Sequence, residues 1–303
     1  MNTRDLEAFV AVVESGSMVR AAEKLFLTQP GLTRRVQSLE TTLGTALLDR
    51  QSKPLKPTPA GNEVYALART VLRAVDDLLA VASPDSESTG EMRIGVPPFL
   101  SELALEGPVD RLRSAFPKLT LRVAAGWSPG LLQDAERGLV DAAVVLMPAD
   151  VTLPSTLTTT LLGKQPTIIV APRTLGLPDT PTTLAELSCH PWVLNQDGCG
   201  MRSALGRALL AAGLPFNVAV EAFGSELQLS LVARGMGIGL AVPEMLEASA
   251  YRNAIQQISA TDFHGVLNIW LIHGMLPGRL VRPVALMRES LLEKLGHEST
   301  STV

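Results

Sequence analysis

The chain has 303 residues, of which 46% are hydrophobic and 18% charged, a balance typical of a folded protein and not of a disordered one. No apolar run is long enough to cross a bilayer, and the start MNTRDLEAF lacks the apolar core of a secretory signal, so we expect a cytoplasmic protein without membrane partners. The net charge of −4 argues against nucleic acid binding, yet residues 1–60 carry eight Lys or Arg against six Asp or Glu.

Two short helices joined by a tight turn are predicted within Ser17–Glu40, after a first helix at Arg4–Glu14. In the second of the pair, Leu32, Val36 and Leu39 recur at helical spacing and should face inward. The opposite face is polar and cationic, as in a helix-turn-helix that enters a major groove. An ordinary helical hairpin with a solvated charged face is the alternative, and this stretch leaves both open. The candidate DNA contacts here are Thr28, Gln29, Pro30, Thr33, Arg34, Arg35 and Gln37.

A small basic hairpin is predicted directly after the helix pair. A short strand at residues 46–48, a polar turn and a returning segment at residues 55–57 would form a wing. Arg50 and Lys53 lie in this turn, where basic side chains can reach phosphates or a minor groove. We therefore expect both to contribute to DNA binding.

A long helix is predicted from Thr58 to Ala82, followed by a polar linker at residues 83–90. Its apolar residues alternate steps of four and three, which is the repeat of a coiled-coil seam. A helix packed only on its own domain is the alternative, but we expect this helix to pair two subunits. The predicted seam consists of Val64, Ala68, Val71, Val75, Leu78 and Ala82.

From Met92 onward, predicted strands and helices alternate, which indicates parallel sheets covered on both faces. A crossover near the middle would create two lobes with a ligand between them. The expected fold class is α+β multidomain. The domains would be a winged helix-turn-helix at 1–58, a dimerising linker helix and hinge at 59–90, and a two-lobed α/β domain at 91–303. The lobes would comprise about 91–163 plus 266–303, and about 164–265.

The chain resembles the LysR-type transcriptional regulators in the string LEAFVAVVESGSMVRAAEKLFLTQPGLTRRVQSLETTLGTALLDR, followed by LKPTPAG. The segments LRVAAGWSPGLLQDAERGLVDAAVV and SLVARGMGIGLAVPE resemble that family's effector domain more loosely. The resemblance implies a periplasmic-binding-protein-like C-terminal region and a dimer or dimer of dimers on double-stranded DNA. It also implies a small-molecule effector, with RNA polymerase as a further candidate partner. Gly31-Leu32 and Lys53-Pro54 depart from the family pattern and leave the operator sequence open.

A small carboxylate is the predicted effector, because several helix N-termini should converge on the cleft between the lobes. Arg202 could hold its carboxylate in a fork, although a solvated helix arginine is the alternative interpretation. Ser128 stands where the resembled family places a ligand-contacting hydroxyl. The candidate ligand contacts are Phe99, Leu100, Ser101, Trp127, Ser128, Gln196, Arg202 and Ser225.

Two rival classes remain, an enzyme and a solute-binding protein without DNA activity. Residues 126–130 match the G-x-S-x-G pattern of a hydrolase, but Pro129 follows the serine and has no N–H for an oxyanion hole. No cluster with metal-ligand spacing is visible, so we expect no catalysis, metal or cofactor. Peroxide-sensing members of the resembled family carry a reactive cysteine near Cys199. With only Cys189 as a possible partner, we interpret both cysteines as structural or incidental.

Overall fold

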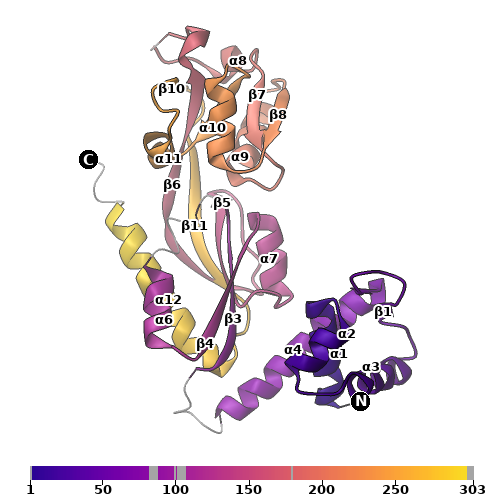
Figure 1. Ribbon diagram of the computed structural model, residues 1–303. Coiled ribbons are helices and arrows are strands. Elements are labelled where there is room, and N and C mark those ends of the chain that lie inside the picture. The colour runs from indigo at the N-terminus through magenta and orange to yellow at the C-terminus, as the bar shows by residue number, and fades with distance from the viewer. Residues whose placement is uncertain (1, 82–87, 99, 101–106, 179, 299–303) are drawn as a thin grey trace.

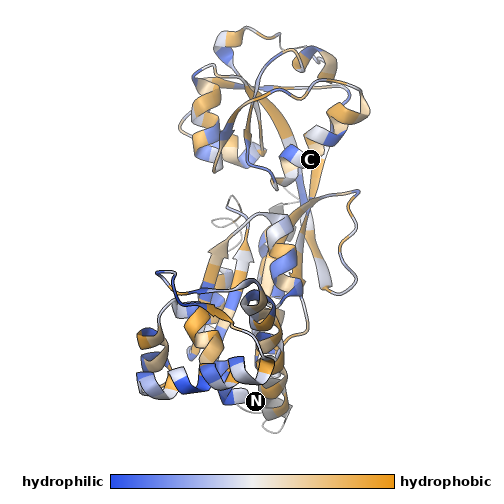
Figure 2. Cartoon of the chain, turned by 90° about the vertical axis from the view of Figure 1, so that its right-hand side faces the viewer, coloured by the Kyte–Doolittle hydropathy of each residue, from blue (hydrophilic) through white to orange (hydrophobic). Residues whose placement is uncertain are grey.

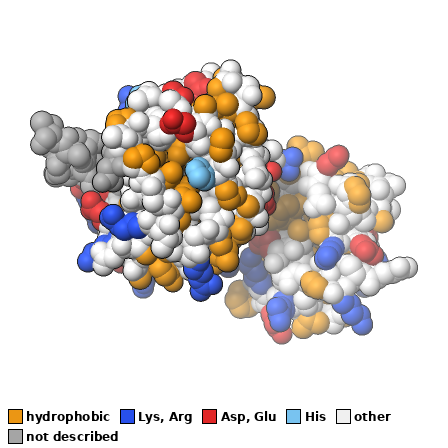
Figure 3. All heavy atoms as spheres, turned by 90° about the horizontal axis from the view of Figure 1, so that it is seen from above, with side chains coloured by type: hydrophobic (Ala, Val, Ile, Leu, Met, Phe, Trp, Pro, Cys, Tyr) orange, Lys and Arg blue, Asp and Glu red, His pale blue; other side chains and the backbone are white. Residues whose placement is uncertain are grey.

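The computed structural model describes residues 2–81, 88–98, 100, 107–178 and 180–298. A helical N-terminal domain projects to one side of two stacked lobes that contain β-sheet (Figures 1 and 3). The lobes are joined by the long strands β6 (Thr158–Pro172) and β11 (Gly265–His273). The order of the elements therefore matches the expected α+β architecture.

Three capped helices form the N-terminal domain. Asn2 and Asp5 make a capping box at the start of α1 (Thr3–Ser15), and the left-handed Gly16 ends it. Ser17 caps α2 (Met18–Lys24). Thr28 caps α3 (Gln29–Leu43), which carries Pro30 in its first turn. The apolar sides of the three helices enclose one core, so their relative positions follow from the periodicity of the sequence.

The predicted wing is present as β1 (Leu48–Asp49) paired antiparallel with β2 (Lys56–Pro57). It leads directly into the long helix α4 (Pro59–Val81). On α4, the predicted seam needs correction, because Ala68 is buried and Val64 packs against the N-terminal core. That row of residues joins α4 to its own domain, and Ala82 lies outside the described residues.

Another row of apolar residues on α4 remains exposed. Leu67, Val71 and Leu78 expose 67%, 46% and 72% of their surface, and the exposed Ala74 lies between them. These four residues again step by four, three and four, so they form a stripe along one side of the helix. We call Leu67, Val71, Ala74 and Leu78 the α4 stripe. Of these four residues, Val71 and Leu78 also belong to the predicted seam.

Lobe I is built on the parallel strands β3 (Gly90–Val96), β4 (Leu119–Ala125) and β5 (Ala142–Pro148). Alternate residues of β5 enter two different cores, because successive side chains of a strand point to opposite faces. Helix α7 (Ser128–Glu136) contributes to one core. Helices α6 (Pro108–Ala115) and α12 (Gly278–Glu298) contribute to the other. Residues 101–106, which precede Gly107 and α6, lie outside the described residues.

Lobe II repeats this arrangement around β7 (Trp192–Asn195), which pairs in parallel with β8 (Val218–Ala222) and β9 (Ile238–Ala241). Trp192 and Leu194 face the core that receives α9 (Gly200–Ala211), whereas Val193 faces α10 (Ser225–Ala233). The short helices α8 (Leu184–Leu187) and α11 (Pro243–Ala248) complete the lobe. The hydropathy colouring shows largely apolar strands enclosed by amphipathic helices (Figure 2).

The expectation of purely parallel sheets is wrong where the lobes meet. Strand β11 pairs antiparallel with both β5 and β6, and β6 pairs antiparallel with β9 and with β10 (Ile255–Ile258). The first half of β6, which contains Gly163 and Pro166, was not among the predicted strands. These antiparallel strands connect the two lobes. Among the described residues, no helix is long and apolar enough to span a bilayer.

Candidate functional site

The outer face of α3 presents the side chains predicted to contact DNA. Leu32, Val36 and Leu39 are fully buried and fix the rotation of the helix about its axis. The opposite side therefore faces outward. There, Thr28, Gln29, Pro30, Arg34 and Gln37 are exposed, while Thr33 and Arg35 are half-buried.

Two threonines on this face are engaged with the backbone of α3. The Thr28 hydroxyl accepts a hydrogen bond from the Gly31 N–H at 3.3 Å, so its main role is that of an N-cap. The Thr33 hydroxyl donates to the Gln29 carbonyl oxygen at 2.9 Å. Gln29, Arg34 and Gln37 remain the side chains best placed to reach a partner.

The wing is held against α3 by Glu40, a residue that the sequence analysis did not single out. One of its carboxylate oxygens accepts from the Leu47 N–H at 2.9 Å and the Leu48 N–H at 3.4 Å. The other oxygen pairs with the Arg50 guanidinium at 2.9 Å. Arg50 is thus first a positioning residue for the wing, and the exposed Lys53 stands at the turn beyond it.

Most basic side chains of α3 and the wing have no carboxylate partner among the described residues. Within the described part of the chain, Arg34, Arg35, Lys53 and Lys56 make no ion pair, whereas Arg50 is paired with Glu40. Unpaired, solvated cations on one face are suited to phosphate contacts, because binding releases the counterions of the nucleic acid. This face of the N-terminal domain is the candidate nucleic-acid interface.

Between the lobes, two contacts join residues far apart in sequence. Trp127 of lobe I meets Phe223 of lobe II edge to face, with ring centroids 5.8 Å apart. Asp150, just after β5, pairs with Arg207 of α9 at 2.9 Å. These contacts add to the packing of α9 on β5 and β11, which also joins the two lobes.

Several cavities open in the region where the lobes approach one another, and two of them include predicted ligand contacts. The α9 cavity, of about 360 Å³, lies between the start of α7 and α9 and includes Arg202 and Arg207. The α10 cavity, of about 490 Å³, includes Pro98 of lobe I and Glu226 and Glu244 of lobe II. The first has arginines for an anion, whereas the second has carboxylates and no basic side chain in its lining.

Arg202 is largely enclosed, with 13% of its side chain exposed, and does not behave as a solvated helix residue. Its Nε pairs with Asp197 at 3.0 Å, and its Nη1 pairs with Glu221 at 2.6 Å and donates to the Asn195 carbonyl oxygen at 3.0 Å. The Asp197 side chain is 91% exposed, so this carboxylate is weakly held and can be displaced.

The other predicted ligand contacts do not converge on one cavity. The buried Ser128 hydroxyl accepts a hydrogen bond from the Leu146 N–H at 2.9 Å, so it positions β5. Leu100 is fully buried in the core and does not line either cavity. Ser225 lines the α10 cavity, and Gln196 is exposed beside Asp197. Phe99 and Ser101 lie outside the described residues.

The two cysteines differ in environment. Cys199 occupies the N-cap position of α9 without a side-chain capping hydrogen bond and is buried. Burial raises the pKa of its thiol above the ordinary value despite nearby backbone N–H groups and Arg202. Cys189 is exposed. Among the described residues, no three His, Cys, Asp or Glu side chains are grouped to hold a metal.

At neutral pH we expect the Cys199 thiol to react slowly with a disulfide reagent, because the raised pKa leaves little of the reactive thiolate. Titration of the native chain should give one fast thiol from Cys189 and one slow thiol from Cys199, and denaturation should make both fast. Cys189→Ser should abolish the fast phase. A fast phase that persists in this variant would contradict the buried, protonated thiol.

Comparison with known families places two matches on the chain. Residues 3–62 match the bacterial regulatory helix-turn-helix protein, lysR family, and residues 85–293 match the LysR substrate binding domain. The hydrogen peroxide-inducible genes activator of Dickeya chrysanthemi is 31% identical over 266 residues, covering 80% of this chain and 81% of that protein. The transcriptional regulator YeiE of Escherichia coli is 26% identical over 270 residues, covering 89% and 90%.

Solved structures share the arrangement of the whole chain. Full-length OxyR from Pseudomonas aeruginosa superposes with a TM-score of 0.77 at 18% identity, covering 96% of this chain and 94% of that one. Full-length CbnR, solved in complex with its target DNA, gives a TM-score of 0.60 at 21% identity, covering 96% and 100%. These similarities concern the fold.

Proposed function

The chain belongs to the LysR family of bacterial transcriptional regulators, and on this premise we propose how its own residues bind DNA and effector. It has a DNA-binding helix-turn-helix domain and an effector-binding domain, and the family consists of regulators and not of enzymes. The proposal is that α3 enters the major groove and the wing contacts the flanking backbone. The bounds 1–58, 59–90 and 91–303 for the three parts of the chain belong to the same proposal.

The observation that carries the DNA contacts is the division of α3 into a fully buried apolar side and an outer side with unpaired cations. Gln29, Thr33 and Arg34 are assigned to base edges, with Arg34 able to pair with guanine through two hydrogen bonds. Pro30 offers an apolar contact. Thr28, Arg35, Arg50 and Lys53 are assigned mainly to phosphates, and Gln37 extends the outer side of the helix.

We further propose that the α4 stripe pairs two subunits, giving a dimer or a dimer of dimers. Leu67 and Leu78 are large apolar side chains that expose most of their surface along one side of the helix, which favours burial against a second copy. Two copies of α3 would then contact two half-sites of an imperfect palindrome. RNA polymerase remains a predicted partner.

For the effector, the α9 cavity supports the prediction of a small carboxylate better than the α10 cavity does. Arg202 can exchange the exposed Asp197 for a ligand carboxylate while Glu221 continues to orient the guanidinium. Pro129 and Leu146 of lobe I and Phe216 of lobe II offer apolar surface for the rest of the molecule. A ligand there would contact both lobes and shift the equilibrium between their relative positions.

The effector proposal is tested by a thermal-shift screen of small carboxylic acids followed by calorimetry. Arg202→Gln should weaken binding of an acid found in the screen by about tenfold or more, since a charge-assisted pair is lost. The matched control is Arg252→Gln, on the exposed surface near α11, which should leave the affinity unchanged. Equal affinity of the Arg202→Gln and parent chains would place the carboxylate elsewhere.

A further inference from the structure

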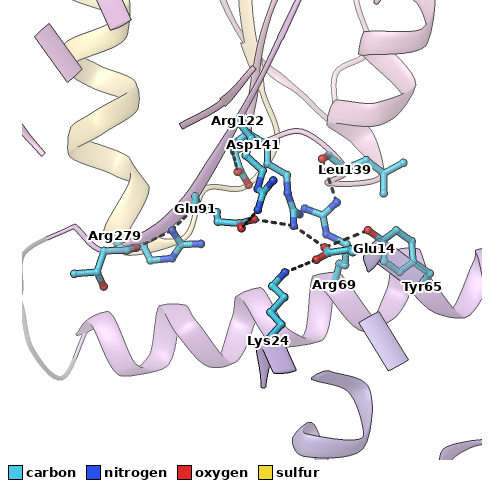
Figure 4. A network of polar contacts seen from close by, with 11 residues as sticks. Glu14, Lys24, Tyr65, Arg69, Glu91, Arg122, Leu139, Asp141 and Arg279 are labelled. Atoms are coloured by element: carbon cyan, nitrogen blue, oxygen red, sulfur yellow. Dashed lines mark hydrogen bonds and ion pairs between the residues drawn. The ribbon is translucent and has the colours of Figure 1, made fainter. Parts of the chain in front are cut away.

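The N-terminal domain meets lobe I across a polar junction that neither candidate site uses (Figure 4). A cavity of about 460 Å³ lies where α1, α2 and α4 face strands β3 and β4. Arg20, Lys24 and Arg69 line it from the N-terminal domain, and Arg93 and Arg122 line it from lobe I. We call this space the junction cavity.

The junction cavity has a surplus of positive charge. Five basic side chains line it, while only Glu14 and Glu91 provide carboxylates, which leaves an excess of three positive charges. Glu14 pairs with Lys24 at 2.9 Å and with Arg93 at 2.6 Å. Glu91 pairs with Arg93 at 3.3 Å and with Arg122 at 2.7 Å. The two carboxylates are thus shared among three of the five cations.

Arg69 is the most deeply placed of these cations, with 6% of its surface exposed. Its Nη1 donates to the Leu139 carbonyl oxygen at 3.1 Å, and its guanidinium carbon lies 5.8 Å from the centre of the Tyr65 ring. Within the described residues, it has no carboxylate partner. Burying a cation without an anion is costly, so an external anion would stabilise this arrangement.

Glu14 and Tyr65, which line the cavity beside the cations, have shifted pKa values. Burial raises the pKa of Glu14, but Arg93 and Lys24 together outweigh burial and lower it, so this carboxylate stays ionised. Burial, reinforced by Glu14, raises the pKa of Tyr65 to about 12, so its hydroxyl remains a neutral donor. Arg20 is exposed and makes no ion pair among the described residues. Neither Glu14 nor Tyr65 therefore adds a negative charge beyond the two carboxylates already counted.

We propose that the junction cavity binds a small polyvalent oxyanion of the pyrophosphate or phosphate-ester class. Arginine forks suit phosphate oxygens, and the cavity volume falls within the range of small-molecule sites. Because the cations come from both sides of the junction, the anion stabilises the state in which the N-terminal domain rests against lobe I. An anion in the junction cavity would act on the position of the N-terminal domain independently of an effector in the α9 cavity.

The test titrates the full chain with inorganic pyrophosphate in a calorimeter, at constant ionic strength maintained with sodium chloride. We expect saturable binding of one anion per chain. Arg20→Gln and Arg122→Gln should each weaken it about tenfold, because each removes a charge-assisted contact. The Arg20 side chain is exposed and that of Arg122 is 59% exposed, so both variants should stay folded, as checked by circular dichroism.

Three further measurements test the location of the anion-binding site and the chemical class of the anion. Arg252→Gln, the matched control, should leave pyrophosphate affinity unchanged. Loss of binding in Arg34→Gln would instead place the anion on the DNA-binding face and overturn the proposal, as would the absence of saturable binding. Adenosine diphosphate, titrated in parallel, should bind with the same sensitivity to Arg20→Gln if the ligand is a phosphate ester. Binding of pyrophosphate alone narrows the class to inorganic anions.

Discussion

Replacing Leu67 and Leu78 by aspartate together should leave the chain monomeric in sedimentation and lower its affinity for a two-half-site operator by about a hundredfold or more. Both side chains lie on the exposed α4 stripe, so the monomer loses little packing of its own. In a paired helix, however, each aspartate would bury a carboxylate without a partner. The large loss of affinity follows because two linked recognition helices bind far more tightly than one.

Asn62→Asp is the matched control, because it adds a carboxylate to an exposed position on another side of the same helix. It should leave the sedimentation coefficient unchanged. The melting temperature of the lobes should also be similar in all three proteins. An unchanged dimer in the double variant would rule out the α4 stripe as the subunit interface.

Removing the Arg34 side chain should cost about 1–3 kcal/mol of binding to the operator and relax the preference at one base pair. The Arg34 guanidinium is exposed on α3 and, within the described residues, makes no ion pair, so it can reach a guanine edge. Competition titrations with operators substituted one base pair at a time would measure both effects. Equal losses on operator and random DNA would contradict a base contact.

Lys53→Ala, in the wing, should affect DNA binding differently from a change at Arg34, because Lys53 is assigned to a phosphate and not to a base. A phosphate contact carries no sequence information, so this variant should bind all DNA sequences more weakly. It should also reduce the slope of log affinity against log salt by about one. A change in base preference in this variant would contradict a pure phosphate role.

The N-terminal domain could be predicted closely because its signals are local. Caps at Ser17 and Thr28 and inward residues at helical spacing define α2 and α3 without knowledge of their partners. On α4 the same reasoning combined Val64 and Ala68, which pack in the N-terminal core, with the exposed Val71 and Leu78. Rows through Ala68 and through Leu67 both have helical spacing, and only the packing of α4 on α1 shows which one is buried.

The sites between elements could not be predicted, because they depend on contacts between distant segments. Glu14 and Arg93 are 79 residues apart and meet only when the N-terminal domain lies against lobe I. Similarly, the first half of β6 becomes a strand because β11 pairs with it, although its own sequence contains Gly163 and Pro166. Ser128 was expected at a ligand because it stands where the resembled family places a ligand-contacting hydroxyl, whereas its partner in the structure is the Leu146 N–H.

The central claim, that the N-terminal domain recognises specific DNA, is tested most directly by hydroxyl-radical footprinting of the full chain on the DNA upstream of its own gene. We predict two protected segments on one face of the duplex, with their centres separated by about 10 base pairs or a multiple of that number. Arg34→Ala should weaken protection of both segments together. Uniform protection at all positions, with the same affinity for random DNA of equal length, would contradict sequence-specific binding through α3.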